Sequence, residues 1–299
     1  MKSNSKNETS IVQKIYKKIL KVYPFLTKNE RSIFDKKSKI IIGKSLSGNP
    51  TTKKTIEGLL LLLNANGHAD IKEWHKPNLR EVKRKKSPTL NIDHHILLIR
   101  IPSWVVWLDK FDKKLVTFCQ KNIKKYDALI IDVRENRGGS SRIAHDFANI
   151  FFKKTIVYGK FVRKNKNGKL KTITGRLKPN ETVFIDKPIA ILTSDRCFSS
   201  NELFIAPFKI SKRATLIGQS TAGGSANPIS ETIKISGKKF VVRIPTWRFF
   251  LKGKNQPIEK TKIVPDIIYK RKDIENFAKN YLLEEITKKP VVLLQNSKR

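Results

Sequence analysis

A hydroxyl group at the predicted start of a helix is the first feature of the sequence that is suited to chemistry. Ser199 stands in the segment FSSNE, directly after the predicted buried strand PIAILTS and the polar residues DRC. At such a junction the hydroxyl projects from the carboxyl end of the sheet, where open α/β folds place their sites. The N–H groups at the start of the helix can stabilise an oxyanion. The simpler interpretation is a helix cap, in which Glu202 completes a capping box.

A second strand-to-helix junction carries paired glycines. The segment DVRENRGGSS, residues 132–141, places Gly138 and Gly139 in a turn between a predicted strand and a predicted helix. Glycines let backbone N–H groups come close to a ligand, as an oxyanion hole requires. A phosphate-binding loop is not indicated, because the Lys-Ser/Thr of that motif is absent. A tight structural turn is the alternative interpretation.

A histidine and a glutamate elsewhere in the chain are candidates for activating the hydroxyl. His68 follows a predicted helix stop in NGHAD, and Glu259 lies in PIEKTKIVPD. Neither is specific alone, since a lone histidine after a helix is usually a surface residue and the chain has many carboxylates. A serine nucleophile needs a general base and a group that orients that base, so these two residues matter only if the fold brings them to Ser199.

His145, near the start of the helix after the glycine turn, is the reserve candidate for the base. His94 and His95 are predicted to lie at a strand edge.

The chain is predicted to form two structural parts joined by a linker. Residues 1–76 are predicted to be a helical subdomain, and residues 77–91 a basic linker. Residues 92–299 alternate between apolar strands and amphipathic helices, which indicates an α/β (α+β) core with parallel strand pairing. Two strand-like segments, ETIKIS and FVVRIPT, flank Gly237 and predict a hairpin, and a last helix is expected at about 273–286.

The composition limits the class of protein. The chain has 299 residues, of which 39% are hydrophobic and 29% charged, a balance typical of a globular protein. Cys119 and Cys197 lie far apart without metal-ligand spacing, so no disulfide framework, metal or organic cofactor is predicted. The N-terminal residues lack the apolar core of a secretory signal, and no run is long enough for a transmembrane segment. A cytoplasmic location is therefore the expectation.

The formal net charge of +38 has two interpretations. Clustered lysines and arginines favour a nucleic acid or an anionic membrane as partner. The preferred interpretation is a lysine-rich surface without such a partner, because the lysines are spread along the chain and no nucleic-acid-binding motif accompanies them. The charge should favour acidic over basic substrates.

The four segments together resemble the tail-specific, or carboxyl-terminal-processing, serine peptidase family. The resemblance rests on an Arg-x-Asn-x-Gly-Gly turn at 134–139, on Ser199 three residues before Glu202, and on RATLIGQSTAGGSANP at 213–228. It covers about residues 92–270. It implies a mixed-sheet core of the ClpP/crotonase type and a serine endopeptidase that acts on peptides or unfolded proteins. No PDZ module fits between the helices and the core.

The resemblance also distinguishes two catalytic arrangements. One branch uses a Ser-Lys dyad, whose lysine is missing from the turn TAGGS at 221–225. The branch that contains the tricorn core protease and the interphotoreceptor retinoid-binding-protein-like peptidases uses Ser, His and Glu, with the glutamate six residues before a Pro-Asp motif. Glu259 stands six residues before Pro265. The resemblance therefore implies that Ser199, His68 and Glu259 are the catalytic residues. It implies an oxyanion hole formed by Gly139 or Gly138 and by Ser200. It implies substrate contacts from Thr221, Gly223 and Gly224.

Two alternatives to an active peptidase remain open on the sequence. The first is a catalytically inactive peptide- or ligand-binding relative, because a fold does not dictate turnover. The second is a basic nucleic-acid-associated protein in which the Ser, His and Glu are incidental. The sequence does not indicate the oligomeric state.

Overall fold

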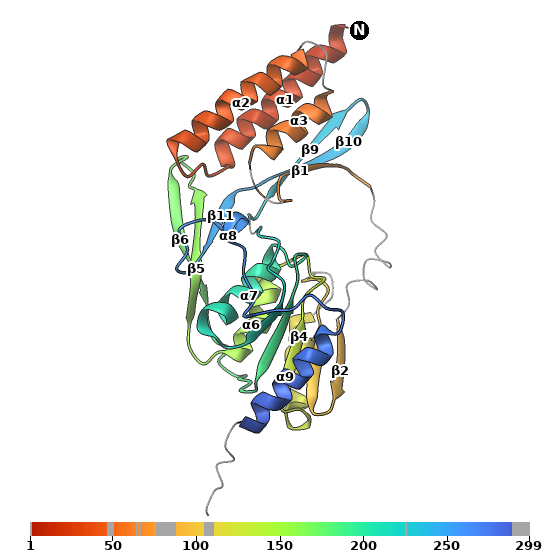
Figure 1. The fold of residues 1–299 in the computed structure, drawn as a ribbon. Helices are drawn as coiled ribbons and strands as arrows, with labels where there is room; N and C mark the ends of the chain where they lie inside the picture. Colours follow the sequence, from red (N-terminus) through yellow and green to blue (C-terminus); the bar gives the residue numbers. More distant parts are fainter. Residues whose placement is uncertain are drawn as a thin grey trace, which may run out of the picture.

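A six-stranded mixed sheet forms the centre of the C-terminal part of the molecule (Figure 1). The computed structural model describes residues 2–46, 51–63, 65, 67–75, 88–104, 111–224 and 226–288. The strand order is β12-β8-β7-β4-β3-β2, and all neighbouring pairs are parallel except β2 with β3. The strands are β2 (Thr89–Asp93), β3 (Ile96–Arg100), β4 (Ala128–Asp132), β7 (Ile189–Thr193), β8 (Thr215–Gly218) and β12 (Ile267–Ile268).

Helices cover both faces of this sheet, which explains why its inner strands are apolar without alternation. On one face Leu129 and Ile131 of β4 join the larger core, which also contains residues of α5 (Phe111–Lys121), α6 (Ser141–Ala148) and α7 (Ser200–Ser211). On the other face Ala128 and Ile130 pack with α9 (Ile274–Lys288). Short 3-10 turns, η1 (Ile123–Lys125) and η2 (Asn149–Phe151), follow α5 and α6.

A second, antiparallel sheet lies beside the core, in the order β11-β5-β6. Its strands are β5 (Ile156–Lys164), β6 (Leu170–Leu177) and β11 (Trp247–Leu251). Aromatic rings cross its face, with Phe161 and Phe249 centroids 4.8 Å apart. In Figure 1 this sheet connects the lower core to the helices at the top of the molecule.

Three helices form the opposite end of the molecule: α1 (Lys2–Val22), α2 (Lys28–Leu46) and α3 (Thr52–Leu61). They share one hydrophobic cluster with a third sheet, in the order β1-β10-β9. Its strands are β1 (Asp70–Glu73), β9 (Ile229–Ile235) and β10 (Lys238–Ile244). The hairpin β9–β10 therefore joins the helices, although it lies far from them in the sequence.

The predicted fold class is confirmed, since the molecule is a mixed α/β structure with a mixed central sheet. The hairpin around Gly237 and the final helix are also present. The proposed boundaries at 76 and 92 stay a prediction; residues 77–87 of the expected linker lie outside the described residues. No helix in the described ranges combines the length and apolar character needed to cross a membrane.

Candidate active site

Ser199 occupies a strained turn between β7 and α7. Its backbone has φ 60° and ψ −125°, a region that residues other than glycine rarely adopt. The turn is held by the Ser199 N–H, which lies 2.8 Å from the carbonyl oxygen of Gly224 and 3.2 Å from a carboxylate oxygen of Glu202. Such strain persists only where the surroundings enforce it, and it is concentrated at functional sites. Ser199 is therefore a candidate nucleophile on structural grounds as well.

The glycine turn lies directly against this serine. Gly138 has φ 98°, and a Cβ added to it would lie 2.7 Å from the Cβ of Ser199. Gly139 has φ 140°, and its added Cβ would lie 1.9 Å from the carbonyl oxygen of Trp104. Both positions exclude a larger residue, because backbone and the serine itself occupy the space. The close approach of the two junctions that the sequence singled out is thus built into the fold.

Two backbone N–H groups beside Ser199 are suited to bind an oxyanion. The Gly138 N–H donates to Asn136 Oδ1 over 2.8 Å, so it is already used. The N–H groups of Gly139 and Ser200 donate to no acceptor among the described residues, and Ser200 begins helix α7. The Ser200 hydroxyl donates to the Gly139 carbonyl over 2.7 Å and holds the start of α7 against the glycine turn. Of the two glycines predicted for the hole, the geometry favours Gly139.

His68 reaches the site from the segment after α3. Its side chain is almost fully buried and stacks on the ring of Phe198, with centroids 4.4 Å apart. Its Nε2 lies 3.2 Å from the carbonyl oxygen of Gly224, the same oxygen that accepts the Ser199 N–H. Burial, aided by the charge of Arg243, lowers the pKa of His68 to about 4, so the imidazole is neutral at pH 7.

An ion pair supports the segment that carries His68. The guanidinium of Arg243 on β10 donates two hydrogen bonds to Asp70, over 2.7 and 2.6 Å. A third, over 3.0 Å, goes to the carbonyl oxygen of Gly67, the residue before His68. This bidentate geometry fixes position as well as charge. The histidine loop is thereby attached to the hairpin β9–β10.

Glu259 lies on the short helix α8 (Ile258–Thr261) and is buried. Burial raises the pKa of its carboxyl to about 7, while the nearby charge of Arg248 opposes the shift. Arg248 Nε and a Glu259 carboxylate oxygen are 3.8 Å apart. The Nδ1 atom of His68, which Glu259 was expected to orient, makes no hydrogen bond within the described part of the chain. The carboxylate is thus drawn to Arg248 in this structure.

The loop at 221–224 is fastened by Glu202. The Thr221 hydroxyl and the N–H groups of Gly223 and Gly224 donate to the fully buried carboxylate over 2.6, 2.9 and 2.7 Å. Burial raises the pKa of Glu202 to about 7, against the effect of these donors. The three residues predicted to contact substrate therefore use these polar groups to hold the loop beside Ser199. Only the Gly224 carbonyl, among the loop groups described above, faces His68 and Ser199.

The other histidines lie elsewhere. His145 is on α6, with Nε2 3.3 Å from the Tyr158 hydroxyl, and burial lowers its pKa. His94 and His95 form the exposed turn between β2 and β3, in agreement with the strand-edge expectation. Sequence reasoning missed Phe198 and Arg248. The available signals were an aromatic residue next to the nucleophile and an arginine within the apolar strand WRFFL.

A serine at a strained strand-to-helix turn, with backbone N–H groups and a neutral histidine beside it, is typical of serine hydrolases. The chain belongs to peptidase family S41, because the sequence model of that family matches residues 95–269, more than half of the chain. The predicted membership in a family of carboxyl-terminal-processing serine peptidases is thereby confirmed.

One curated protein and several solved structures are similar to this chain. A carboxyl-terminal-processing protease of Synechocystis sp. (strain ATCC 27184 / PCC 6803 / Kazusa) is 30% identical over 98 residues, which is 32% of this chain and 21% of the relative. A lipoprotein from Streptococcus agalactiae superposes with TM-score 0.62 at 20% identity, over 93% of this chain and 96% of the other. Mature CPAF complexed with lactacystin gives TM-score 0.56 at 14% identity, over 71% and 60%. At these identities the two structures support the fold alone.

Proposed function

We propose that this chain is a serine endopeptidase that hydrolyses peptide bonds through an acyl-enzyme intermediate. Ser199 Oγ attacks the carbonyl carbon of the substrate, and His68 takes the hydroxyl proton. The N–H groups of Gly139 and Ser200 stabilise the oxyanion. His68 then donates the proton to the leaving amine, and water releases the acyl group from Ser199 by the reverse sequence of steps.

The observation that carries the proposal is the meeting of His68 and Ser199 at one carbonyl oxygen, that of Gly224. The buried imidazole is neutral at pH 7, so one of its ring nitrogens has a lone pair that can accept a proton. The strained backbone of Ser199 and the two N–H groups beside it supply the nucleophile and the oxyanion donors. These features come from separate segments and converge on one place.

A small rearrangement accompanies the chemistry. Nε2 of His68 faces the Gly224 carbonyl, so in this arrangement it carries the proton. To act as a base toward Ser199, the imidazole must move its proton to Nδ1. Glu259, released from Arg248, is the proposed acceptor for that Nδ1–H and orients the ring. Catalytic hydrogen bonds often tighten only when substrate is bound.

The proposed substrates are peptides or unfolded protein segments. The net charge of +38 favours acidic over basic chains, because it raises the local concentration of anionic substrates.

A second candidate is a catalytically inactive binding protein on the same fold. The observation in its favour is the 3.8 Å approach of Glu259 to Arg248, combined with the unbonded Nδ1 of His68 within the described residues. If the imidazole stays on Gly224 when peptide binds, the site captures substrate without cleaving it.

Labelling with a serine-directed fluorophosphonate, combined with a hydrolysis assay, separates the active peptidase from the inactive binding protein. The wild-type chain should become labelled and Ser199→Ala should not, while Ser211→Ala, at the far end of α7, serves as the matched control. Hydrolysis of an acidic, unfolded protein by wild type, with loss in His68→Ala but not in His145→Ala, assigns the base. Equal labelling of Ser199→Ala and wild type would show that the nucleophile is wrongly assigned. Labelling without any hydrolysis supports the inactive relative.

A further inference from the structure

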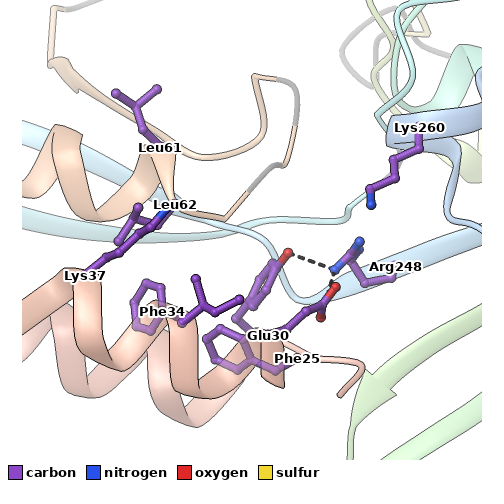
Figure 2. Close-up of a pocket in the computed structure, with 10 residues that line it drawn as sticks. Phe25, Glu30, Phe34, Lys37, Leu61, Leu62, Arg248 and Lys260 are labelled. Atoms are coloured by element: carbon purple, nitrogen blue, oxygen red, sulfur yellow. Dashed lines mark hydrogen bonds and ion pairs between the residues drawn. The ribbon is translucent and has the colours of Figure 1, made fainter. Parts of the chain in front are cut away.

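A cavity of about 340 Å³ lies between the helices and the core, and the proposed chemistry does not use it. Residues of α2 and of the end of α3 form one side of it, and Arg248 on β11 and Lys260 on α8 form the other (Figure 2). Its volume is within the range of small-molecule sites, about 300–1,000 Å³.

One side of the cavity is apolar and partly open to solvent. Phe34 is buried and forms part of its wall. Ile33 and Leu61 also line it, and they remain 45% and 78% exposed. Large apolar side chains that stay exposed beside a cavity are typical of a binding site rather than of a finished core.

The opposite side is cationic, because Arg248 and Lys260 line it. Lys37 adds a third cation from the α2 side, and Glu30, also on α2, is the one carboxylate among the described lining residues. Glu30 is itself engaged, because it accepts the Leu26 N–H over 2.7 Å. Lys260 is exposed and forms no ion pair with any residue that the structure describes.

Arg248 gives this side its specificity. It is 3% exposed, and one of its terminal N–H groups donates to the Tyr23 hydroxyl over 3.0 Å. Its Nε makes no hydrogen bond with a described residue and lies 3.8 Å from a carboxylate oxygen of Glu259. Its Nη1 lies 3.7 Å from a carboxylate oxygen of Glu30. A buried guanidinium with unmet donor capacity favours an additional anionic acceptor.

We propose that this cavity binds a small organic carboxylate. The carboxylate group pairs with Arg248 and Lys260, and the apolar group lies against Phe34, Ile33 and Leu61. An aliphatic acid and the carboxyl-terminal residue of a peptide share this chemistry. The ligand must be small, since the cavity accommodates one apolar group and its carboxylate.

Binding in this cavity has a route to the candidate active site. Arg248 lines the cavity, and its Nε lies 3.8 Å from a carboxylate oxygen of Glu259. A ligand carboxylate on Arg248 competes with Glu259 for the same guanidinium and frees the glutamate to turn toward His68. This consequence rests on the proposed function, whereas ligand binding does not, so the two are measured separately.

Calorimetric titration of the full chain with octanoate and with N-acetyl-leucine tests the binding. Octanamide and N-acetyl-leucine amide are the matched uncharged controls. At least one acid should bind, and about tenfold more tightly than its amide, because the charged pair with Arg248 and Lys260 is lost in the amide. Binding of octanoate alone indicates an aliphatic acid as ligand, and binding of N-acetyl-leucine alone indicates a peptide carboxyl terminus.

Two surface variants separate this site from general attraction to a basic protein. Lys260→Gln should weaken binding about tenfold, while Lys262→Gln, on the same segment outside the cavity, should leave it unchanged. Leu61→Glu should abolish binding, while Ile40→Glu, on an exposed part of α2, should not. Equal binding of acids and amides, equal effects within either pair of variants, or no binding of either acid overturns the proposal. None of these results depends on peptidase turnover.

Discussion

The imidazole of His68 lies on the ring of Phe198, with centroids 4.4 Å and planes 24° apart. Phe198 immediately precedes the proposed nucleophile Ser199. The residue that covers the proposed base and the residue from which that base takes a proton are therefore neighbours in the chain. The same ring fills the space beside Gly224, where an added Cβ would lie 2.1 Å from it. Phe198 thus sets both the position of His68 and the dielectric environment around it.

Replacing this ring should therefore change the base without changing the nucleophile. In Phe198→Leu we expect the pKa of His68 to rise from about 4 toward 6.5, because burial is the main cause of its low value. The looser ring should also lower kcat/KM about ten- to hundredfold. An NMR titration of the imidazole and a peptidase assay measure the two effects. Phe184→Leu, at a half-buried ring that contacts Lys153, is the control. An unchanged His68 titration in Phe198→Leu contradicts this account.

The low pKa of His68 also predicts how stability changes with pH. Between pH 6.5 and 4 the unfolded chain binds a proton at this residue that the folded chain does not, so stability falls as the pH falls through this window. The difference of the two pKa values corresponds to about 3 kcal/mol. Urea unfolding at a series of pH values should show wild type losing about that much relative to His68→Gln. Parallel stability profiles of the two proteins rule the prediction out.

Much of the core followed from local sequence patterns. The strands with ALIID and IAILT are apolar throughout, which is what burial on both faces of a parallel sheet requires. Ser199, Gly138 and Gly139 were found because each stands where such a strand gives way to a helix. The carboxyl ends of parallel strands meet at one edge, so these junctions were bound to be close together.

The parts that sequence reasoning missed depend on contacts between distant segments. In β5 buried residues occur in adjacent pairs and the register shifts between Val157 and Gly159, so the period of two that marks a strand is lost. The spacing to Pro265 singled out Glu259, but nothing local indicates that Arg248 approaches its carboxylate. The stacking of His68 on Phe198 likewise joins a segment that precedes the central sheet to a residue between two of its strands, β7 and β8.

The Arg248–Glu259 pair should behave as a coupled unit. Arg248→Met leaves a buried carboxylate without its neighbouring cation, and should reduce the free energy of unfolding by about 3–5 kcal/mol. Glu259→Gln should cost less, and the double variant less than the sum of the two. A double-mutant cycle by urea unfolding measures the coupling. Tyr23→Phe controls for the separate hydrogen bond from Arg248 to Tyr23. Strictly additive effects are incompatible with this pairing.

Gly139→Ala tests whether the oxyanion turn depends on the close approach of two backbones. The added methyl group would lie 1.9 Å from the Trp104 carbonyl oxygen, which already accepts the Ser140 N–H over 2.6 Å, and φ is 140°. Because backbone atoms cannot turn aside as a side chain can, we expect a loss of about 3 kcal/mol or more in stability and loss of peptidase activity. Gly43→Ala is the control: nothing lies within 4 Å of its added Cβ on helix α2, so it should stabilise the chain by about 0.5–1 kcal/mol. Denaturant unfolding and a peptidase assay of both variants test this expectation. A Gly139→Ala protein with the wild-type unfolding midpoint and activity could not contain the turn described here.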